Sequence, residues 1–115
     1  MNLGNLYALQ RQATEAADCY QTALGQAHTI GDLKSEGDIN NNLGTLRHGE
    51  RDFEGAIDYY KKAFIITEQI QDDGMKARSL SNLGSAQRRL GEYSAALENF
   101  QAAIALKQSM GDLYG

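Results

Sequence analysis

Three copies of the tripeptide Asn-Leu-Gly begin at residues 2, 42 and 82, so the chain repeats itself every 40 residues. The repeat extends beyond the tripeptide, because the same interval separates two sets of three alanines and one set of three aromatic side chains. These positions are Ala16, Ala56 and Ala96, then Ala23, Ala63 and Ala103, and then Tyr20, Tyr60 and Phe100. A fixed period of this length is typical of a solenoid, in which each unit buries its apolar face only against its neighbours.

Apolar residues recur at steps of three and four in the second half of each unit, which places them on one face of a helix. In the middle unit this stripe contains Phe53, Ala56, Ile57, Tyr60, Ala63 and Phe64. Weaker stripes in the intervening segments indicate a second helix in each unit. The spacing therefore predicts six helices, over residues 2–11, 13–29, 34–48, 53–70, 75–90 and 93–110. The absence of proline agrees with uninterrupted helices.

Individual residues predict where these helices end and how closely they pack. Asp52 can cap the helix that enters at Phe53, because its carboxylate can accept amide hydrogens of the first turn. Gly91 can supply the left-handed residue that ends a helix. Gly4, Gly44 and Gly84 lie on the first helix of each pair, where glycine costs ~1 kcal/mol relative to alanine. A glycine that recurs at this cost predicts a close approach between the two helices of a pair.

Charge and composition narrow the classes of partner and location. The net charge is −4, with acidic and basic residues interleaved, which argues against a chain-wide attraction to nucleic acid or to anionic membranes. No apolar run approaches the ~20 residues needed to span a bilayer, and the first residues do not form a signal-peptide pattern. Cys19 is the single cysteine, so no internal disulfide forms. We therefore expect a cytoplasmic protein.

The sequence lacks the residue patterns of catalysis and of metal binding. His28 and His48 are the only histidines, and neither belongs to an HExxH or comparable spacing. The acidic turn at residues 72–74 lacks the alternating ligands of a calcium loop, and no GxxxxGK phosphate loop is present. We predict no enzymatic activity, no cofactor and no bound metal.

The repeated positions resemble the tetratricopeptide repeat, whose consensus has Leu-Gly in the first helix and Ala, an aromatic residue and Ala in the second. The matching residues are Leu3-Gly4, Tyr7, Ala16, Tyr20 and Ala23; Leu43-Gly44, Ala56, Tyr60 and Ala63; and Leu83-Gly84, Ala96, Phe100 and Ala103. The standard repeat has about 34 residues. This longer form, with its Asn-Leu-Gly triplet, is similar to the Partner-of-Inscuteable (LGN-type) subclass. The resemblance implies an all-α, right-handed solenoid of antiparallel helix pairs.

The units implied by this resemblance are residues 1–33, 34–73 and 74–115. The first unit starts inside its first helix, and the last ends where the segment after residue 33 would lead into a further repeat. Neither end carries the polar capping helix that solenoids need for solubility. We therefore expect a fragment of a longer array, whose uncovered end faces favour self-association into homo-oligomers.

In this family the first helices of the pairs line a concave groove, and projecting that arrangement onto the sequence gives the expected peptide-binding residues. They are Asn2, Asn5, Asp38, Asn41, Asn42, Thr45, His48, Arg78, Ser81, Asn82, Ser85, Arg88 and Arg89. The asparagine side chains can pair with a peptide backbone, and the arginines can hold carboxylates, which implies an acidic peptide. Two alternatives remain open. The triplet asparagines could bond the neighbouring helix instead, and Arg88 and Arg89 could serve their helix dipole.

The function implied is a scaffold that holds a peptide segment of a partner protein in the groove. Recognition of a chaperone carboxyl terminus is not expected, because Asn41 and Ser81 occupy positions where the two-lysine carboxylate clamp of that group would have lysine. Two other readings compete with the scaffold. One is a self-assembly module that acts through the end faces, and the other is a regulatory sensor domain of a bacterial signalling protein.

Overall fold

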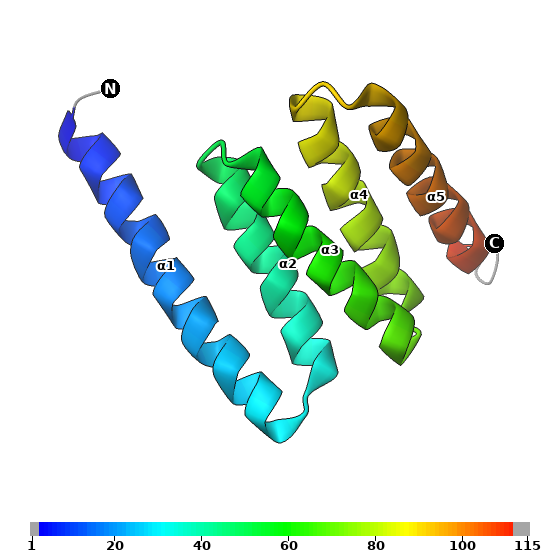
Figure 1. Cartoon of the computed structure of the whole chain (residues 1–115), viewed down its shortest axis with the longest axis horizontal. Helices are drawn as coiled ribbons and strands as arrows, with labels where there is room; N and C mark the ends of the chain where they lie inside the picture. The colour runs from blue at the N-terminus through cyan, green and yellow to red at the C-terminus, as the bar shows by residue number, and fades with distance from the viewer. Residues whose placement is uncertain (1–2, 112–115) are drawn as a thin grey trace.

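The computed structural model describes the backbone of residues 3–111 and the side chains of residues 9–111. Within that range the chain forms five helices and no strand: α1 (Leu3–Ile30), α2 (Leu33–Gly49), α3 (Phe53–Ile70), α4 (Asp73–Arg89) and α5 (Tyr93–Gly111). Helices α2 and α3 form one antiparallel pair, α4 and α5 form a second, and α4 packs on α3 to join them (Figure 1). The predicted all-α class is confirmed. None of the described helices is long and apolar enough to span a membrane.

Three aspartates, spaced 20 residues apart, determine where α2, α3 and α4 begin. Each of Asp32, Asp52 and Asp72 accepts a hydrogen bond from the backbone N–H three residues later, at 3.1, 2.9 and 3.0 Å respectively. These bonds satisfy donors that the first helical turn leaves unpaired. At Asp72 the bond from the Met75 amide also lowers the pKa of the carboxyl group. The predicted cap at Asp52 is confirmed.

The core lies where the two helix pairs meet. Its buried members are Ala56, Ile57 and Tyr60 of α3 and Leu83 and Ala86 of α4. On the other side of Tyr60, α2 comes so close that a Cβ atom built on Gly44 would stand 2.5 Å from a ring carbon. A Cβ on Gly84 would likewise stand 2.9 Å from the ring of Phe100. The predicted close approach within both pairs is confirmed.

The prediction of separate helices over residues 2–11 and 13–29 is wrong, because α1 is one unbroken helix of 28 residues. In the second and third units the corresponding turn passes through a left-handed residue, Arg51 (φ 66°) or Gly91 (φ 84°). The first unit has Arg11 at that position, inside the helix.

Local sequence explains why α1 does not turn. The segment Gln10-Arg11-Gln12-Ala13 consists of good helix formers. Gln12 occupies the position of the capping residue Asp52, and glutamine is not among the preferred caps. Arg11 Nε donates to Glu15 Oε1 at 3.2 Å, so a side-chain bond spans the place where a turn was expected.

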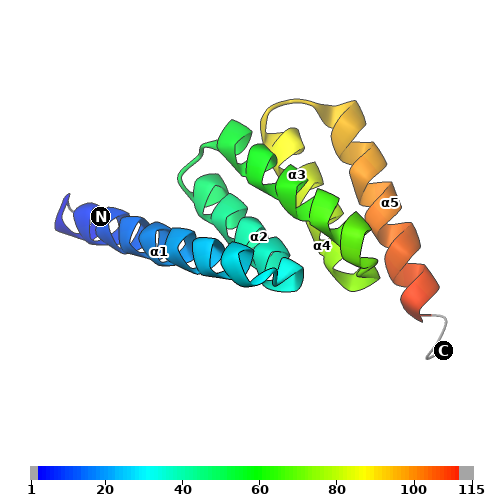
Figure 2. The same ribbon diagram turned by 60° about the horizontal axis from the view of Figure 1, so that its bottom comes forward.

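The amino-terminal half of α1 stands away from the rest of the molecule. Figures 1 and 2 both show α1 close to α2 near its carboxyl end and diverging from α2 toward its amino end. A cleft of about 980 Å³ separates residues 9–14 of α1 from the end of α2 and the following turn. The first unit is therefore open where the other two units are closed.

Candidate functional site

Helices α2 and α4 carry most of the predicted binding residues on one continuous surface. Steps of four and three along each helix place polar side chains on a single stripe. The members are Asp38, Asn42 and Thr45 on α2 and Arg78, Asn82, Ser85 and Arg89 on α4. All seven are exposed or half-buried. This set is called the α2–α4 stripe below.

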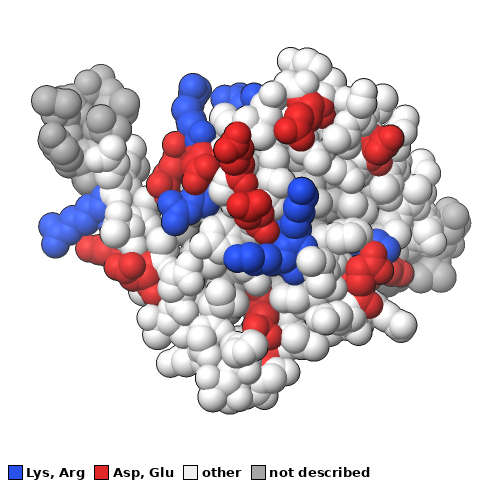
Figure 3. Space-filling model, in the orientation of Figure 1, with Lys and Arg blue, Asp and Glu red and all other residues white. Residues whose placement is uncertain are grey.

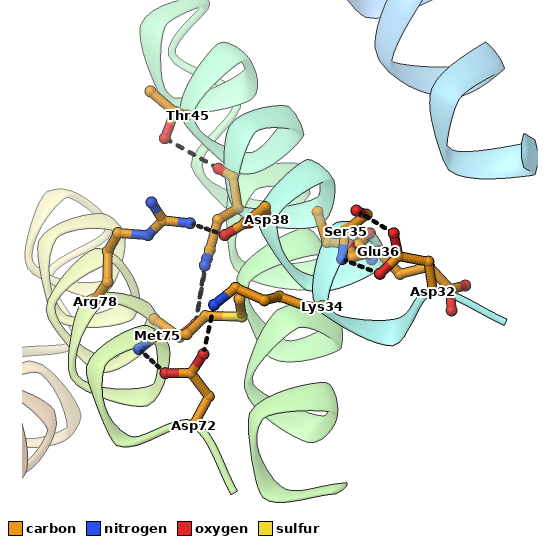
Figure 4. A network of polar contacts seen from close by, with 12 residues as sticks. Asp32, Lys34, Ser35, Glu36, Asp38, Thr45, Asp72, Met75 and Arg78 are labelled. Carbon is orange, nitrogen blue, oxygen red and sulfur yellow. Dashed lines mark hydrogen bonds and ion pairs between the residues drawn. The ribbon is translucent and has the colours of Figure 1, made fainter. Parts of the chain in front are cut away.

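Two ion pairs join α2 to α4 at the beginning of the stripe. Arg78 Nη2 lies 2.8 Å from Asp38 Oδ1, and Lys34 Nζ lies 3.5 Å from Asp72 Oδ2. Figure 4 shows Asp38 and Arg78 pointing toward one another from the two helices. With Met75 these side chains line a hollow of about 220 Å³. Because two cations face two anions there, this end of the stripe is electrically balanced.

Sequence reasoning missed Lys34 and Asp72, although the repeat contained a signal for them. They lie 38 residues apart, and the same separation joins the bonded pair Asn41 and Ser79. A polar residue on the first helix of one unit thus contacts a polar residue of the next unit, about 40 positions later in the sequence. Scanning for complementary side chains at that separation would have found both pairs.

Next to the other end of the stripe, His48 of α2 lies near Arg88 and Arg89, the two arginines that end α4. The guanidinium of Arg89 lies over the ring of Phe53 at 5.2 Å, and the His48 ring packs edge-on against the same ring, with centroids 5.0 Å apart. Burial lowers the pKa of His48, and the positive charges of Arg89 and Arg88 lower it further. Arg88 and Arg89 are both exposed. This end can therefore offer two cations to an anionic ligand.

The distribution of charge elsewhere does not form a large field of one sign. Figure 3 shows acidic and basic side chains interleaved over the face that it presents. Interleaved charges of opposite sign offset one another at a distance, and dissolved salt screens exposed charges beyond about 10 Å at ordinary ionic strength. Recognition by charge on this molecule is therefore local.

Two of the expected groove residues, Asn41 and His48, do not lie on the stripe. Asn41 is 2% exposed, and its Nδ2 donates to Ser79 Oγ at 3.1 Å. Steps of four and three from the buried Gly37 lead through Asn41 and the buried Gly44 to His48, so all four share the inward face of α2. The expectation that Asn41 contacts a peptide is wrong, because a buried amide already bonded to α4 cannot reach one.

Of the remaining expected residues, some lie outside the described range and the others lie on the stripe or beside it. Asn2 and the side chain of Asn5 lie outside the described residues. Ser81 is half-buried and Arg88 is exposed, both on α4 beside the stripe. Asn42, from the repeated triplet, is exposed, and its counterpart Asn82 is half-buried. Among the residues that the structure describes, no group of three or more His, Cys, Asp and Glu side chains could hold a metal ion.

The lowered pKa of His48 predicts a pH dependence of stability. Below about pH 6.5, the ordinary pKa of histidine, the unfolded chain takes up this proton more readily than the folded chain. The free energy of unfolding should therefore fall as the pH drops from 7.5 to 5.5. Asp32 and Asp72, whose pKa values are also lowered, titrate below this window. Urea unfolding at the two pH values checks the effect, and a His48→Asn variant with an undiminished pH dependence would contradict it.

Comparison with known proteins agrees with the helix pairs and their spacing. Two family models described as tetratricopeptide repeat match residues 35–109 and residues 1–34. Among solved structures, the chain is similar to the TPR domain of Arabidopsis FLU, with a TM-score of 0.80, 18% identity and coverage of 92% of this chain and 89% of that one. It is also similar to the N-terminal domain of stress-induced protein-1 (STI-1) from C. elegans, with a TM-score of 0.59, 17% identity and coverage of 90% and 98%. At these identities the two structures establish the fold alone. The match of a repeat model to residues 35–109, well over half of the sequence, shows that the chain belongs to the tetratricopeptide repeat family.

Proposed function

We propose that the chain is a protein-interaction scaffold whose α2–α4 stripe binds an extended or partly helical peptide of a partner protein. Tetratricopeptide repeat domains generally mediate protein–protein interaction, and the family places the chain in this class. The array would form a right-handed solenoid with the stripe on its concave side. Its 40-residue spacing supports a place beside the long-repeat, Partner-of-Inscuteable type.

The observation that carries this proposal is the register of the stripe. Asp38 and Arg78, Asn42 and Asn82, and Thr45 and Ser85 occupy equivalent positions on adjacent helices, so polar side chains continue in two parallel rows across α2 and α4. Amides and hydroxyls both donate and accept hydrogen bonds, which suits a peptide backbone of any sequence. The rows therefore form a surface on which an extended ligand can be held along its length.

The charges decide where an acidic residue of the ligand would bind. Arg78 is already paired with Asp38 at 2.8 Å, so its positive charge is compensated. Arg88 and Arg89 are exposed at the opposite end of α4 and have no such partner among the described ion pairs. A planar guanidinium group can hold a carboxylate through two parallel hydrogen bonds. The acidic end of the peptide is therefore assigned to Arg88 and Arg89 and not to Arg78.

A charge reversal tests this assignment. Peptides of constant length with varied acidic content are screened by fluorescence anisotropy, and the tightest acidic peptide is titrated into the parent and the Arg88→Glu/Arg89→Glu variant. We expect at least a tenfold rise in Kd, about 1.4 kcal/mol, with unchanged far-ultraviolet circular dichroism. Binding in the parent should also weaken as salt is raised, because exposed charge pairs are screened.

The control is a variant with the same change in net charge away from the stripe. Lys61 and Lys62 are exposed on α3, which carries no residue of the stripe, so Lys61→Glu/Lys62→Glu should leave Kd within about twofold, because salt screens exposed charges that do not contact the peptide. An equal loss in both double variants would show that net charge alone attracts the peptide. If the screen selects no acidic peptide, the assignment to Arg88 and Arg89 fails.

Self-assembly through an end face is a second candidate, because α5 exposes the positions that α3 buries. Ile57 of α3 is 8% exposed under α4, whereas its equivalent Leu97 is 57% exposed. Tyr93 and Ile104, on the same helix, are 69% and 54% exposed. An apolar face of this kind is typical of a surface that another helix covers. Mass and distance measurements on the whole chain separate this association from one between the α1 helices of two copies.

A further inference from the structure

The face of α1 that carries Ala16, Tyr20 and Ala23 is only partly covered. The equivalent face of α3 is closed, with Tyr60 at 3% exposure and the two equivalent alanines at 0%. Helix α2 closes it by laying Gly44 against the Tyr60 ring. In contrast, the helix that packs along α1 is α2, which belongs to the next unit, and α3 adds a hydrogen bond from Gln21 Nε2 to the Tyr59 hydroxyl at 3.0 Å. The first unit thus contains the second helix of a helix pair, but no first helix packs on the face that carries Ala16, Tyr20 and Ala23.

The segment that should cover this face is present but lies elsewhere. Residues 3–11 begin with the Leu-Gly pair that corresponds to Leu43-Gly44. As part of the continuous α1, this segment extends along the helix axis, away from the body of the molecule (Figures 1 and 2). Because a straight helix cannot fold back on itself, the segment cannot reach Tyr20 of its own chain. A second copy that runs antiparallel can bring the same segment there.

We propose that two copies of this chain exchange residues 3–11, each segment packing on the Ala16–Ala23 face of the other copy in an antiparallel pair of α1 helices. Gly44 and Tyr60 are 16 residues apart, as are Gly84 and Phe100. The same offset sets Gly4 against Tyr20 of the second copy and places the twofold axis at Gln12. Such an interface uses the same patch on both copies, so it closes at a dimer.

Two features make the exchange favourable relative to a closed hairpin. The contacts that it creates repeat those within the other units, which is why domain swapping is a low-cost route to dimers. If the first unit formed a closed hairpin, it would also lack the large side chain that packs beside the turn between the two helices. Phe53 packs against His48 and Arg89 at that corner in the second unit. The first unit has Ala13 instead, and the cleft of about 980 Å³ is located there.

This inference does not depend on the proposed peptide binding, because α1 lies outside the α2–α4 stripe. Light-scattering mass after size-exclusion chromatography measures association, and a nitroxide label on Cys19, the single and exposed cysteine, measures geometry. Cys19 lies seven residues from Gln12. At about 1.5 Å per residue and 8–10 Å between axes, the two Cys19 Cα atoms of the dimer should be about 23 Å apart.

The expected result is a dimer whose dipolar spectrum gives a label separation near this value, within about 10 Å. A monomer across a tenfold range of concentration would overturn the proposal. A dimer without the short distance would overturn it as well, and is the result expected for association through the exposed face of α5.

A second variant tests whether the missing turn at residues 11 and 12 causes the exchange. Arg11→Gly/Gln12→Asp restores the glycine of the third unit and the capping aspartate of the second, so each chain should close on itself and run as a monomer with helicity like that of the parent. The matched control, Arg11→Ala/Gln12→Ala, keeps the helix continuous and should remain a dimer with the short distance. If the turn variant is folded and still dimeric with that distance, residues 3–11 are not exchanged. If it does not fold, the Cys19 distance in the parent still decides the question.

Discussion

Replacing Gly44 with alanine is expected to lower the free energy of unfolding by ~1–3 kcal/mol, although the same change inside a helix is ordinarily stabilising. The added Cβ would stand 2.5 Å from a carbon of the Tyr60 ring. That ring is 3% exposed, and its hydroxyl lies 3.2 Å from the hydroxyl of Thr45. Neither the ring nor α2 can yield without losing packing, so the clash outweighs the gain in helix propensity. Urea unfolding of parent and variant measures the difference.

The chain offers a matched control for this substitution. Gly25 is also a helical glycine, but a Cβ built there has nothing within 4 Å. Gly25→Ala should therefore raise stability by ~0.5–1 kcal/mol, the usual advantage of alanine inside a helix. Gly84→Ala should lie between the two, because the nearest ring, Phe100, is 2.9 Å away but only half-buried. Equal effects at Gly44 and Gly25 would refute the close approach.

Helices α2 to α5 could be predicted from the sequence, because individual residues signal where helices begin and end. Asp52 supplies a side-chain acceptor at one turn and Gly91 a left-handed residue at another, and both signals can be read from single residues. The first unit shows the limit of the same reasoning. A pattern shared by three units hides the one segment, residues 10–13, in which the local signals are missing.

Which of the candidate site residues are exposed could be predicted only in part, and the reason is a different one. A helical period determines which residues share a face, but it does not determine which face packs against a neighbour. Asn41 and Asn42 are adjacent in sequence and about 100° apart around α2. One is buried against α4 and the other is exposed. Only the position of α4 distinguishes them, and that position follows from packing between units and not from the composition of α2.

The buried pair between Asn41 and Ser79 should contribute strongly to the joining of the second and third units. Ser79 is fully buried and Asn41 is 2% exposed, and the two are linked by bonds of 3.1 and 3.3 Å. Ser79→Ala leaves the buried amide without this partner, so it should cost ~1–3 kcal/mol. Ser85→Ala, the same change on the half-buried stripe of α4, should stay within about 0.5 kcal/mol of the parent.

A double-mutant cycle separates this pair from the loss of volume. Asn41→Ala also costs stability, because it removes buried atoms and leaves Ser79 unpaired. The combined Asn41→Ala/Ser79→Ala variant should lose less than the two single losses together, by ~0.5–3 kcal/mol, because only one bonded pair can be broken. Additive losses would show that the amide and the hydroxyl act independently. In that case the apolar contact of α3 with α4 and the two ion pairs between α2 and α4 would hold the two units together without a contribution from this buried pair.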